Sequence, residues 1–489
     1  MYTNIVDNID FINNKFSNSS DLTLRRMVFP NKAKTKFAVY TLEGMVDSAD
    51  VASLILNPIF NFTNKEEYEK LDGKQLFDFV YGHILSGSDI SGSTDFEPLL
   101  HKLMSGFALV LFDGVETGLC VGVQGYKYRS VDEPNNESSQ RGSREGFIEP
   151  IKPNMGLLRR RLKTTDLVFE SMAIGSEVKT NIVICYRKSK VSKDILDTLK
   201  NRLKKCNLRN LLGSGYLVTY LEDNRSNKLF SGVGVTERPD TAAGKINEGR
   251  IAIIVDGSPA VLIVPRLFVE NFQSFDDYTN RPYYSGFVRI LKYFSFVIAI
   301  LLPAIFVAVL AYYPQLIPLQ LLGNIISSIR RTPLPVMIEV ILMYFIYEIT
   351  REAGLRSPRL LTQTVGIVGG LVIGDAAVGA GIIGAPTLLI VAMSAVCSIA
   401  VPDLYSPCTI LRLVFILLGG IFGIWGIAIG FFVLIVELCS KTSFGIAFLS
   451  PIAPFSAKGM KDVFIRANWR SLSDGPIMVQ DFLQGAENE

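Results

Sequence analysis

Histidine and paired cysteines are scarce in this 489-residue sequence. There are two histidines, His83 and His101, and six cysteines without a CxxC pair. Two histidines are too few for a metal centre, and scattered cysteines are typical of reduced thiols rather than of disulfides or a zinc site. We therefore expect no metal ion, no cofactor and no disulfide framework.

Common catalytic and nucleotide-binding motifs are also missing. The sequence contains no GxSxG, HExxH or Walker A pattern, and Gly73-Lys74 is followed by Gln75, where a Walker A motif needs Ser or Thr. The net charge of +3 is small, and no basic patch with interleaved aromatic residues stands out. We expect a protein that is not an enzyme and does not bind nucleic acid.

Charge is rare in one long part of the chain. Of the 95 Lys, Arg, Asp and Glu residues, only 13 lie between Ile290 and Ser440. A charged side chain in hydrocarbon costs several kcal/mol, so this distribution predicts a segment embedded in lipid. The predicted fold is an α+β cytoplasmic N-terminal region (1–285), then a polytopic α-helical membrane domain (286–440) of four to six segments, then a polar C-terminal tail (441–489).

Within the N-terminal region, residues 1–95 are polar and indicate helices between Asn- and Ser-rich turns. From His101 onward the pattern indicates strands, including a hairpin at FALVLFDG and TGLCVGVQGY and another around Asp256-Gly257. A helix with Ile195, Leu199 and Leu203 on one face follows the third strand. A polar linker near residues 130–150 predicts two subdomains.

Positive charge predicts the orientation in the membrane. Arg281, Arg289 and Lys292 lie at the start of the first apolar run, which extends from Ile290 to Tyr313, and the N-terminus lacks the pattern of a cleaved signal. Because Lys and Arg beside a span favour the cytoplasmic side, we expect the N-terminal region to be cytoplasmic.

Several polar residues interrupt the apolar runs. Gln320 and Asn324 lie on one face of an amphipathic segment that either lies in the interface or lines water. Glu339 and Asp375 are acids within apolar runs, and such residues are costly unless they are paired or used. Asp375 either caps a break between packed helices or faces an ion path.

Two further patterns suggest contacts. Gly366, Gly370 and Gly374 recur every four residues, a spacing that lets helix backbones approach closely. Three adjacent arginines, Arg159–Arg161, cannot share one helix face. They either form a solvated helix paired with nearby glutamates or contact lipid headgroups or a partner subunit.

Seven motifs in order resemble the A-subunit family of bacterial spore germinant receptors, the GerA type. The likeness covers residues 100–455, about three-quarters of the chain, and departs slightly from the family at Gly142-Ser143, where GPREGF is usual. The motifs are REGFIEPIKPNMGLLRRRLK, TERPD, EGRIAIIVDGSPAVLIVP, DDY, REAGLRSP, IVGGLVIGDAAVGAG and LSPIAP.

The resemblance implies a receptor component in the inner membrane of the spore. Such a subunit acts with a transporter-like B subunit, which binds the nutrient, and with a lipoprotein C subunit. It also implies a homo-oligomer that forms a nutrient-gated channel for monovalent cations, without catalytic residues. A secondary transporter, for which the apolar runs show no internal repeat, and a membrane-anchored scaffold remain the alternatives.

Overall fold

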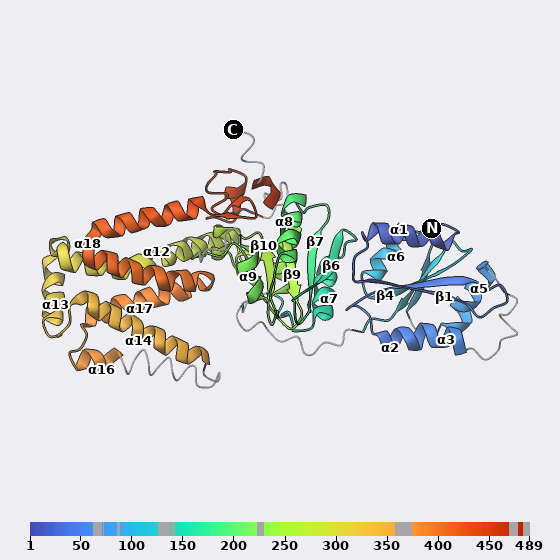
Figure 1. The fold of residues 1–489 in the computed structure, drawn as a ribbon, viewed down its shortest axis with the longest axis horizontal. Helices are drawn as coiled ribbons and strands as arrows, with labels where there is room; N and C mark the ends of the chain where they lie inside the picture. The colour runs from blue at the N-terminus through green and yellow to red at the C-terminus, as the bar shows by residue number, and fades with distance from the viewer. Residues whose placement is uncertain are drawn as a thin grey trace.

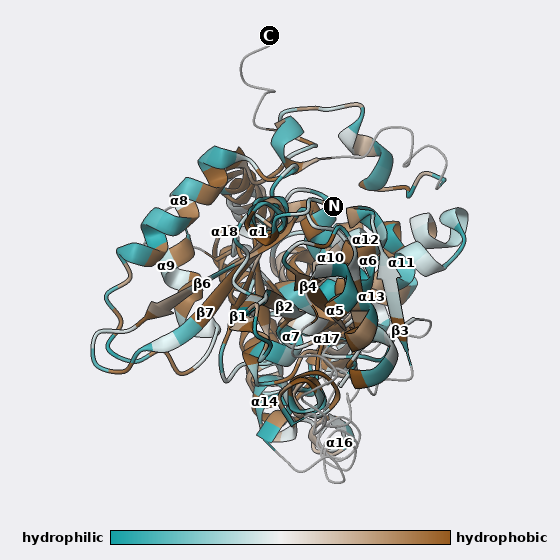
Figure 2. Ribbon diagram, turned by 90° about the vertical axis from the view of Figure 1, so that its right-hand side faces the viewer, coloured by the Kyte–Doolittle hydropathy of each residue, from teal (hydrophilic) through white to brown (hydrophobic). Residues whose placement is uncertain are grey.

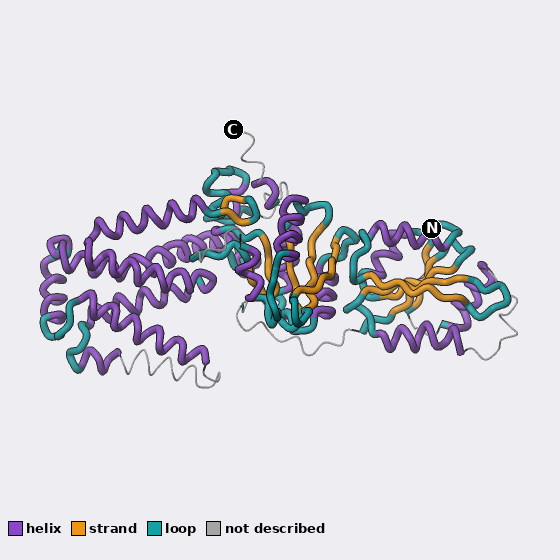
Figure 3. Tube along the Cα trace, viewed as in Figure 1, coloured by secondary structure: helices purple, strands orange, loops and turns teal. Residues whose placement is uncertain are grey.

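The computed structural model consists of two sheet-containing parts and a helical bundle, which follow one another along the long axis (Figures 1 and 3). Strands are confined to the first two parts and to a short C-terminal hairpin (Figure 3). The residues that the structure describes are 1–61, 71, 73–85, 89–125, 137, 142–222, 229–356, 374–468 and 478–482.

A five-stranded antiparallel sheet with the order β1-β2-β4-β5-β3 forms the first part. Its elements are α1 (Ile5–Lys15), β1 (Leu22–Val28), β2 (Lys36–Leu42), α2 (Ser48–Val51), α3 (Asn57–Asn61), α5 (Gly73–Phe79), β3 (Ile90–Ser93), α6 (Phe96–Leu103), β4 (Phe107–Phe112) and β5 (Gly118–Gly122). Side chains alternate along a strand, so Tyr40 packs with α1 and α6 while Val39 packs with α3 and α5 on the other face. The central strand β4 is buried throughout.

The prediction of helices in residues 1–95 is incomplete, because strands β1, β2 and β3 lie in this stretch beside helices α1, α2, α3 and α5. β1 is an edge strand whose Arg25 and Arg26 are both exposed, which breaks the apolar alternation by which strands are recognised. The predicted hairpin of β4 and β5 is confirmed.

A second antiparallel sheet has the order β6-β7-β9-β10-β8. Its elements are α7 (Ile151–Arg161), β6 (Leu167–Ile174), β7 (Thr180–Arg187), α8 (Lys193–Lys204), α9 (Gly215–Leu221), β8 (Gly234–Thr236), α10 (Pro239–Asn247), β9 (Ile251–Val255) and β10 (Val261–Val264). Helices α7 and α10 pack on one face, and α8 and α9 on the other. The predictions for α8 and for the hairpin of β9 and β10 are confirmed, and Figure 2 shows the mixed hydrophilic and hydrophobic surface of α8.

The two sheets meet where α7 approaches the loop after β2. A Cβ added at Gly156 would lie 2.3 Å from the carbonyl oxygen of Gly44, and one added at Gly44 would lie 2.2 Å from that of Lys152. Gly44 also has a φ of +77°, which favours glycine. The backbones can touch here only because both positions lack a side chain.

Six α-helices of the described residues belong to the bundle. They are α12 (Pro282–Tyr312), α13 (Leu319–Ile329), α14 (Val336–Arg356), α16 (Gly374–Gly379), α17 (Ala385–Ile399) and α18 (Tyr405–Ser440). Among the described residues, Pro282–Tyr312 and Pro402–Ser440 are long and apolar enough to cross a membrane. Helix α13 lies across the end of the bundle farthest from the sheets (Figure 1).

Helix α18 is a helical hairpin rather than one rod, as its two limbs in Figure 1 show. Gly423 has a φ of +62° and breaks the helix. A Cβ added at Gly430 would lie 2.7 Å from Cδ1 of Leu418, although a straight helix would separate these residues by about 18 Å. The last apolar run therefore reverses direction and returns toward the sheets.

The sequence analysis expected a polar C-terminal tail, but the C-terminal residues that the structure describes are packed against the second sheet. They form the hairpin of β11 (Thr442–Ser443) and β12 (Ile446–Ala447) and then pack on the second sheet. Phe444, Ile446 and Val463 are buried in the core of that sheet. Gly and Pro between these apolar residues hide any helix or strand period, which is why composition alone misleads here.

Candidate functional site in the helical bundle

Pro303 creates a polar site in the middle of α12. Because proline has no N–H, the carbonyl of Ala299, four residues earlier, lacks its helical donor. Two buried side chains from other helices replace that donor: Ser394 Oγ of α17 at 2.8 Å and Arg412 Nε of α18 at 2.9 Å. The proline break thus joins three helices.

Arg412 is 1% exposed and lies among apolar helices. Its Nη2 donates to the carbonyl of Ser394 at 3.3 Å, and the guanidinium lies 4.9 Å from the ring centroid of Tyr344. Within the described residues it has no ion pair, and its Nη1 has no hydrogen-bond partner. Carbonyl oxygens and an aromatic face therefore hold a permanent positive charge that no carboxylate of the described residues pairs with.

Glu339 of α14 is also fully buried. Its carboxylate accepts hydrogen bonds from the Thr332 hydroxyl, from the Thr387 hydroxyl at 2.9 Å and from the backbone N–H of Gly384 at 3.2 Å. Gly384 is the N-cap of α17, where the helix dipole favours a negative charge. Glu339 therefore fastens α14 to the start of α17, and its oxygens are occupied by donors.

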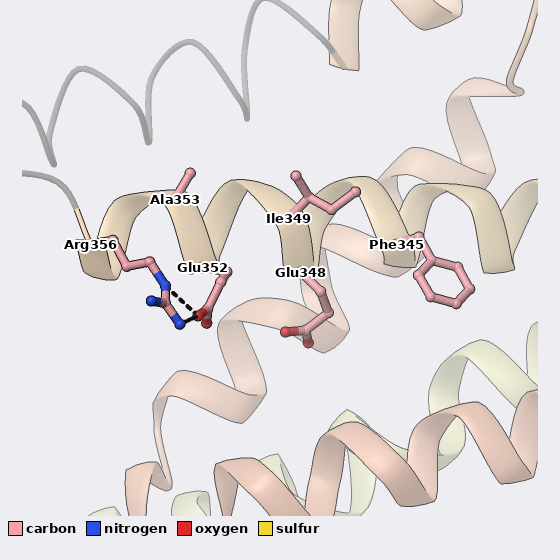
Figure 4. A pocket seen from close by; sticks show the side chains of 6 residues that line it. All are labelled: Phe345, Glu348, Ile349, Glu352, Ala353 and Arg356. Carbon is pink, nitrogen blue, oxygen red and sulfur yellow. Dashed lines mark hydrogen bonds and ion pairs between the residues drawn. The ribbon is translucent and has the colours of Figure 1, made fainter.

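Glu348, about two and a half helical turns further along α14, contacts the start of α18. Tyr405 donates to its carboxylate at 2.8 Å, and Arg351 lies 4.0 Å away. Figure 4 shows Glu348 on the side of α14 that also carries Glu352 and Arg356, which form an ion pair at 2.7 Å. These ion pairs join residues three and four positions apart, a spacing that places side chains on one face of a helix.

The structure does not bring the other candidate ion-path residues together with Glu339. Gln320 and Asn324 are exposed on α13, and Asp375 is exposed in the first turn of α16. Gly374 is buried, and a Cβ there would lie 3.3 Å from the side chain of Leu388 on α17. The other two glycines of that pattern, Gly366 and Gly370, lie outside the described residues.

Of the three arginines on α7, Arg159 does not meet the expectation of a solvent, headgroup or partner contact, because it is fully buried. It forms an ion pair of 2.7 Å with Asp21 of the first sheet. Arg160 and Arg161 both pair with Glu145, the latter at 2.7 Å. Successive helix positions differ by about 100°, so one of three adjacent arginines turns inward.

Outside the bundle, Glu270 is a buried acid with a strongly lowered pKa. Burial alone would raise the pKa of its carboxyl, but the charges of Arg250 and Lys245 outweigh burial and lower the pKa to about 2. Arg250 Nη2 lies 2.7 Å and Lys245 Nζ 2.5 Å from Oε1 of Glu270.

Across the described part of the chain, no three His, Cys, Asp or Glu side chains are grouped to hold a metal ion.

One buried group, Arg412, escaped the sequence analysis. It acts together with Pro303, yet 109 positions separate the two in the sequence. The signal that could have found Arg412 is its position, since an arginine inside an apolar run as long as Tyr405–Ser440 needs a partner.

An antiparallel two-sheet region is followed by an apolar helical bundle with buried polar side chains, in which two of the described helices are long and apolar enough to cross a membrane. A family model described as the Bacillus/Clostridium GerA spore germination protein matches residues 10–478. The chain belongs to this GerA family of spore germination proteins, which confirms the resemblance found in its motifs.

Individual relatives are similar over most of their length. Spore germination protein KA of Bacillus subtilis (strain 168) is 35% identical over 467 residues, which cover 95% of this chain and 85% of that protein. Spore germination protein GerLA of Bacillus cereus is 32% identical over 480 residues, with coverages of 98% and 96%. The crystal structure of the N-terminal domain of the A subunit of the Bacillus megaterium spore germinant receptor GerK3 is 29% identical, with a TM-score of 0.42, and the match covers 55% of this chain and 97% of that one.

Proposed function

We propose that this protein is the A subunit of a nutrient receptor in the inner membrane of the spore. In this proposal the bundle is a multi-pass membrane domain, the two sheets are cytoplasmic, and the protein works with a transporter-like B subunit and a lipoprotein C subunit without catalysing a reaction. The observation that carries the proposal is the burial of Glu339 and Arg412 among apolar helices in a chain of the GerA family.

The length of α12 supports a membrane location. Its 31 residues extend about 46 Å, whereas hydrocarbon is about 30 Å thick. The first turns, which carry Arg289 and Lys292, would then lie at the cytoplasmic headgroups. Tyr283 and Tyr284 are exposed at this end, as residues of an interfacial aromatic belt are.

We further propose that copies of the chain assemble and form a gated path for monovalent cations. The core of a single chain is unsuited to cations, because Arg412 is positive and the carboxylate of Glu339 is occupied. Asp375, by contrast, is exposed and could attract cations between neighbouring copies, together with Gln320 and Asn324.

Replacing Asp375 with Asn tests this path, because it removes the charge and keeps the shape. We expect nutrient-triggered release of potassium from spores to slow several-fold, with normal receptor levels and a normal response to a trigger that bypasses receptors. The matched control is Glu352→Gln, which removes another exposed acid whose partner is Arg356. Release at the wild-type rate in the Asp375 variant, at normal receptor levels, would contradict a role for Asp375 in conduction.

A further inference from the structure

The chain passes from the second sheet into the bundle through a short elbow, Asn280–Pro282, between α11 (Phe275–Thr279) and α12. The C-terminal segment (441–468 and 478–482) begins where α18 ends and lies beside the junction between the second sheet and α12 (Figure 1). The first and last helices of the bundle therefore meet the soluble region at one point.

Arg289, in the second turn of α12, is the centre of this meeting point and is fully buried. Its Nε donates to Asp277 of α11 at 2.9 Å. Its Nη1 donates to both the backbone oxygen and Oδ1 of Asp462, each at 2.7 Å. One guanidinium thus joins the elements on both sides of the elbow to the C-terminal segment.

Arg466 of the C-terminal segment holds the elbow itself. It is 1% exposed, and its Nη1 donates to the carbonyls of Asp277 at 3.1 Å and Asn280 at 2.9 Å. These carbonyls belong to the end of α11, where intrahelical donors run out. An arginine from 186 residues away therefore supplies the C-terminal cap of the helix that precedes the bundle.

Two neutral side chains complete the contact. Tyr278 donates its hydroxyl to Oδ2 of Asp462 at 2.7 Å, and Gln273 donates to the backbone oxygen of the same residue at 3.0 Å. Burial, together with the negative charge of Asp462, raises the pKa of the Tyr278 hydroxyl well above its usual value, so it remains a donor at neutral pH. Asp462 is thereby held by α11, α12 and the residues before them.

We propose that the C-terminal segment is a clamp that locks the elbow and makes the soluble region, α12 and the end of α18 move as one unit. The clamp would transmit a rearrangement of the soluble region directly to the bundle. This role in transmission rests on the proposed receptor function, whereas the clamp itself does not. Asp462 and Arg466 are positioning residues in this proposal.

The connection is rigid because breaking only some of its ion pairs costs free energy. Arg289 and Asp277 are both buried, at 0% and 3% exposure of their side chains. Removing one partner of a buried pair leaves a desolvated charge, so partial opening is strongly penalised. A flexible linker of three residues would transmit no force, whereas a capped and paired elbow does.

Hydrogen exchange on the purified full-length protein in detergent tests the clamp. Asp462→Asn should speed exchange of the amides of residues 277–286 about a hundredfold, as expected when the fully buried guanidinium of Arg289 loses the charge of a carboxylate partner. Tyr278→Phe, which removes one hydroxyl and keeps the ring, should speed it about tenfold. The control is Lys458→Gln, which removes an exposed pair of 3.1 Å in the same segment and should change nothing. Unchanged exchange in both test variants would overturn the clamp.

Transmission is measured in spores that carry the same three variants. We expect the nutrient response to slow in Tyr278→Phe and Asp462→Asn, but not in Lys458→Gln, at equal receptor levels. If a variant shows faster hydrogen exchange at the elbow but a nutrient response at the wild-type rate, the proposed role of the clamp in transmission is contradicted. If Asp462→Asn lowers the receptor level, the milder Tyr278→Phe decides the matter. If the wild-type gene restores no nutrient response, the proposed receptor function is contradicted. The hydrogen-exchange experiment would still test the clamp.

Discussion

Neutralising Asp21 should separate the two sheets, because Asp21 carries the buried ion pair between them. Arg159 donates its Nε to Asp21 at 3.0 Å and its Nη2 to both carboxylate oxygens, at 3.0 and 2.7 Å. The side chains are 0% and 1% exposed. The guanidinium also donates to two carbonyls of its own subdomain and lies 4.9 Å from the ring centroid of Phe169, so it stays buried when Asp21 is lost.

The expected magnitude follows from that geometry. Breaking a buried pair by removing one partner costs about 3–5 kcal/mol. Asp21→Ala should weaken the contact between the sheets by this amount, and Asp21→Asn, which keeps one acceptor oxygen, by about half as much. A matched control joins the same two subdomains at the surface: Lys152 and Glu43 lie 3.1 Å apart, and their side chains are 64% and 34% exposed. Lys152→Gln should cost less than about 1 kcal/mol.

Hydrogen exchange of the full-length protein separates these outcomes. Asp21→Ala should speed exchange of the amides of β1 and β2 about a hundredfold, which corresponds to roughly 3 kcal/mol, while those of β7 and β9 change little. An effect of Asp21→Ala no larger than that of Lys152→Gln would refute the reasoning. The two subdomains would then be held mainly by their other contacts, such as the backbone contact of Gly44 and Gly156 and the hydrogen bond from the Ser20 N–H to the carbonyl of Phe169.

Two other expectations concern stability. Arg412→Lys keeps the charge but loses the planar fork whose Nε and Nη2 bind the carbonyls of Ala299 and Ser394. The bundle should therefore lose about 2 kcal/mol of stability, against about 1 kcal/mol for Ser394→Ala, and melt at a lower temperature in detergent. Equal melting temperatures for Arg412→Lys and wild type would contradict this. Glu270 has a pKa lowered from 4.5 to about 2 in the folded state, so its contribution is present above pH 4.5 and is lost as the pH falls toward 2. Glu270→Gln should therefore flatten the loss of stability over this interval, and an unflattened acid-unfolding curve would count against the assignment.

The elements that the sequence predicts well are those with a strong local pattern. Strands β9 and β10 are two runs rich in β-branched residues on either side of the turn at Gly257, and α8 has one apolar face. Local sequence therefore determines both the hairpin and the helix. Edge strand β1 was missed because half of its residues face water. The C-terminal segment was missed because its apolar residues follow no period, and only the second sheet gives them a place.

The candidate site was predicted less well, for a different physical reason. Glu339 could be recognised as an intramembrane acid, but its partner Thr387 lies 48 residues away, and no local pattern connects them. Asp375 looks buried in the sequence because its neighbours are apolar, whereas the structure of the single chain exposes it. Hydrophobic surroundings in sequence therefore do not distinguish a residue in a packed core from one on the surface of a bundle.

The four largest fully buried side chains are arginines, and each lies at a junction between parts of the molecule: Arg159, Arg289, Arg412 and Arg466. A guanidinium has five donors in a planar fork, so it can bind more oxygens from different elements at once, and in a more fixed geometry, than the three donors of a lysine can. Such a joint gains little stability over an apolar contact, but breaking it halfway leaves a buried charge unpaired. Junctions of this kind favour discrete arrangements over gradual deformation, which is the mechanical property that a gated receptor subunit needs.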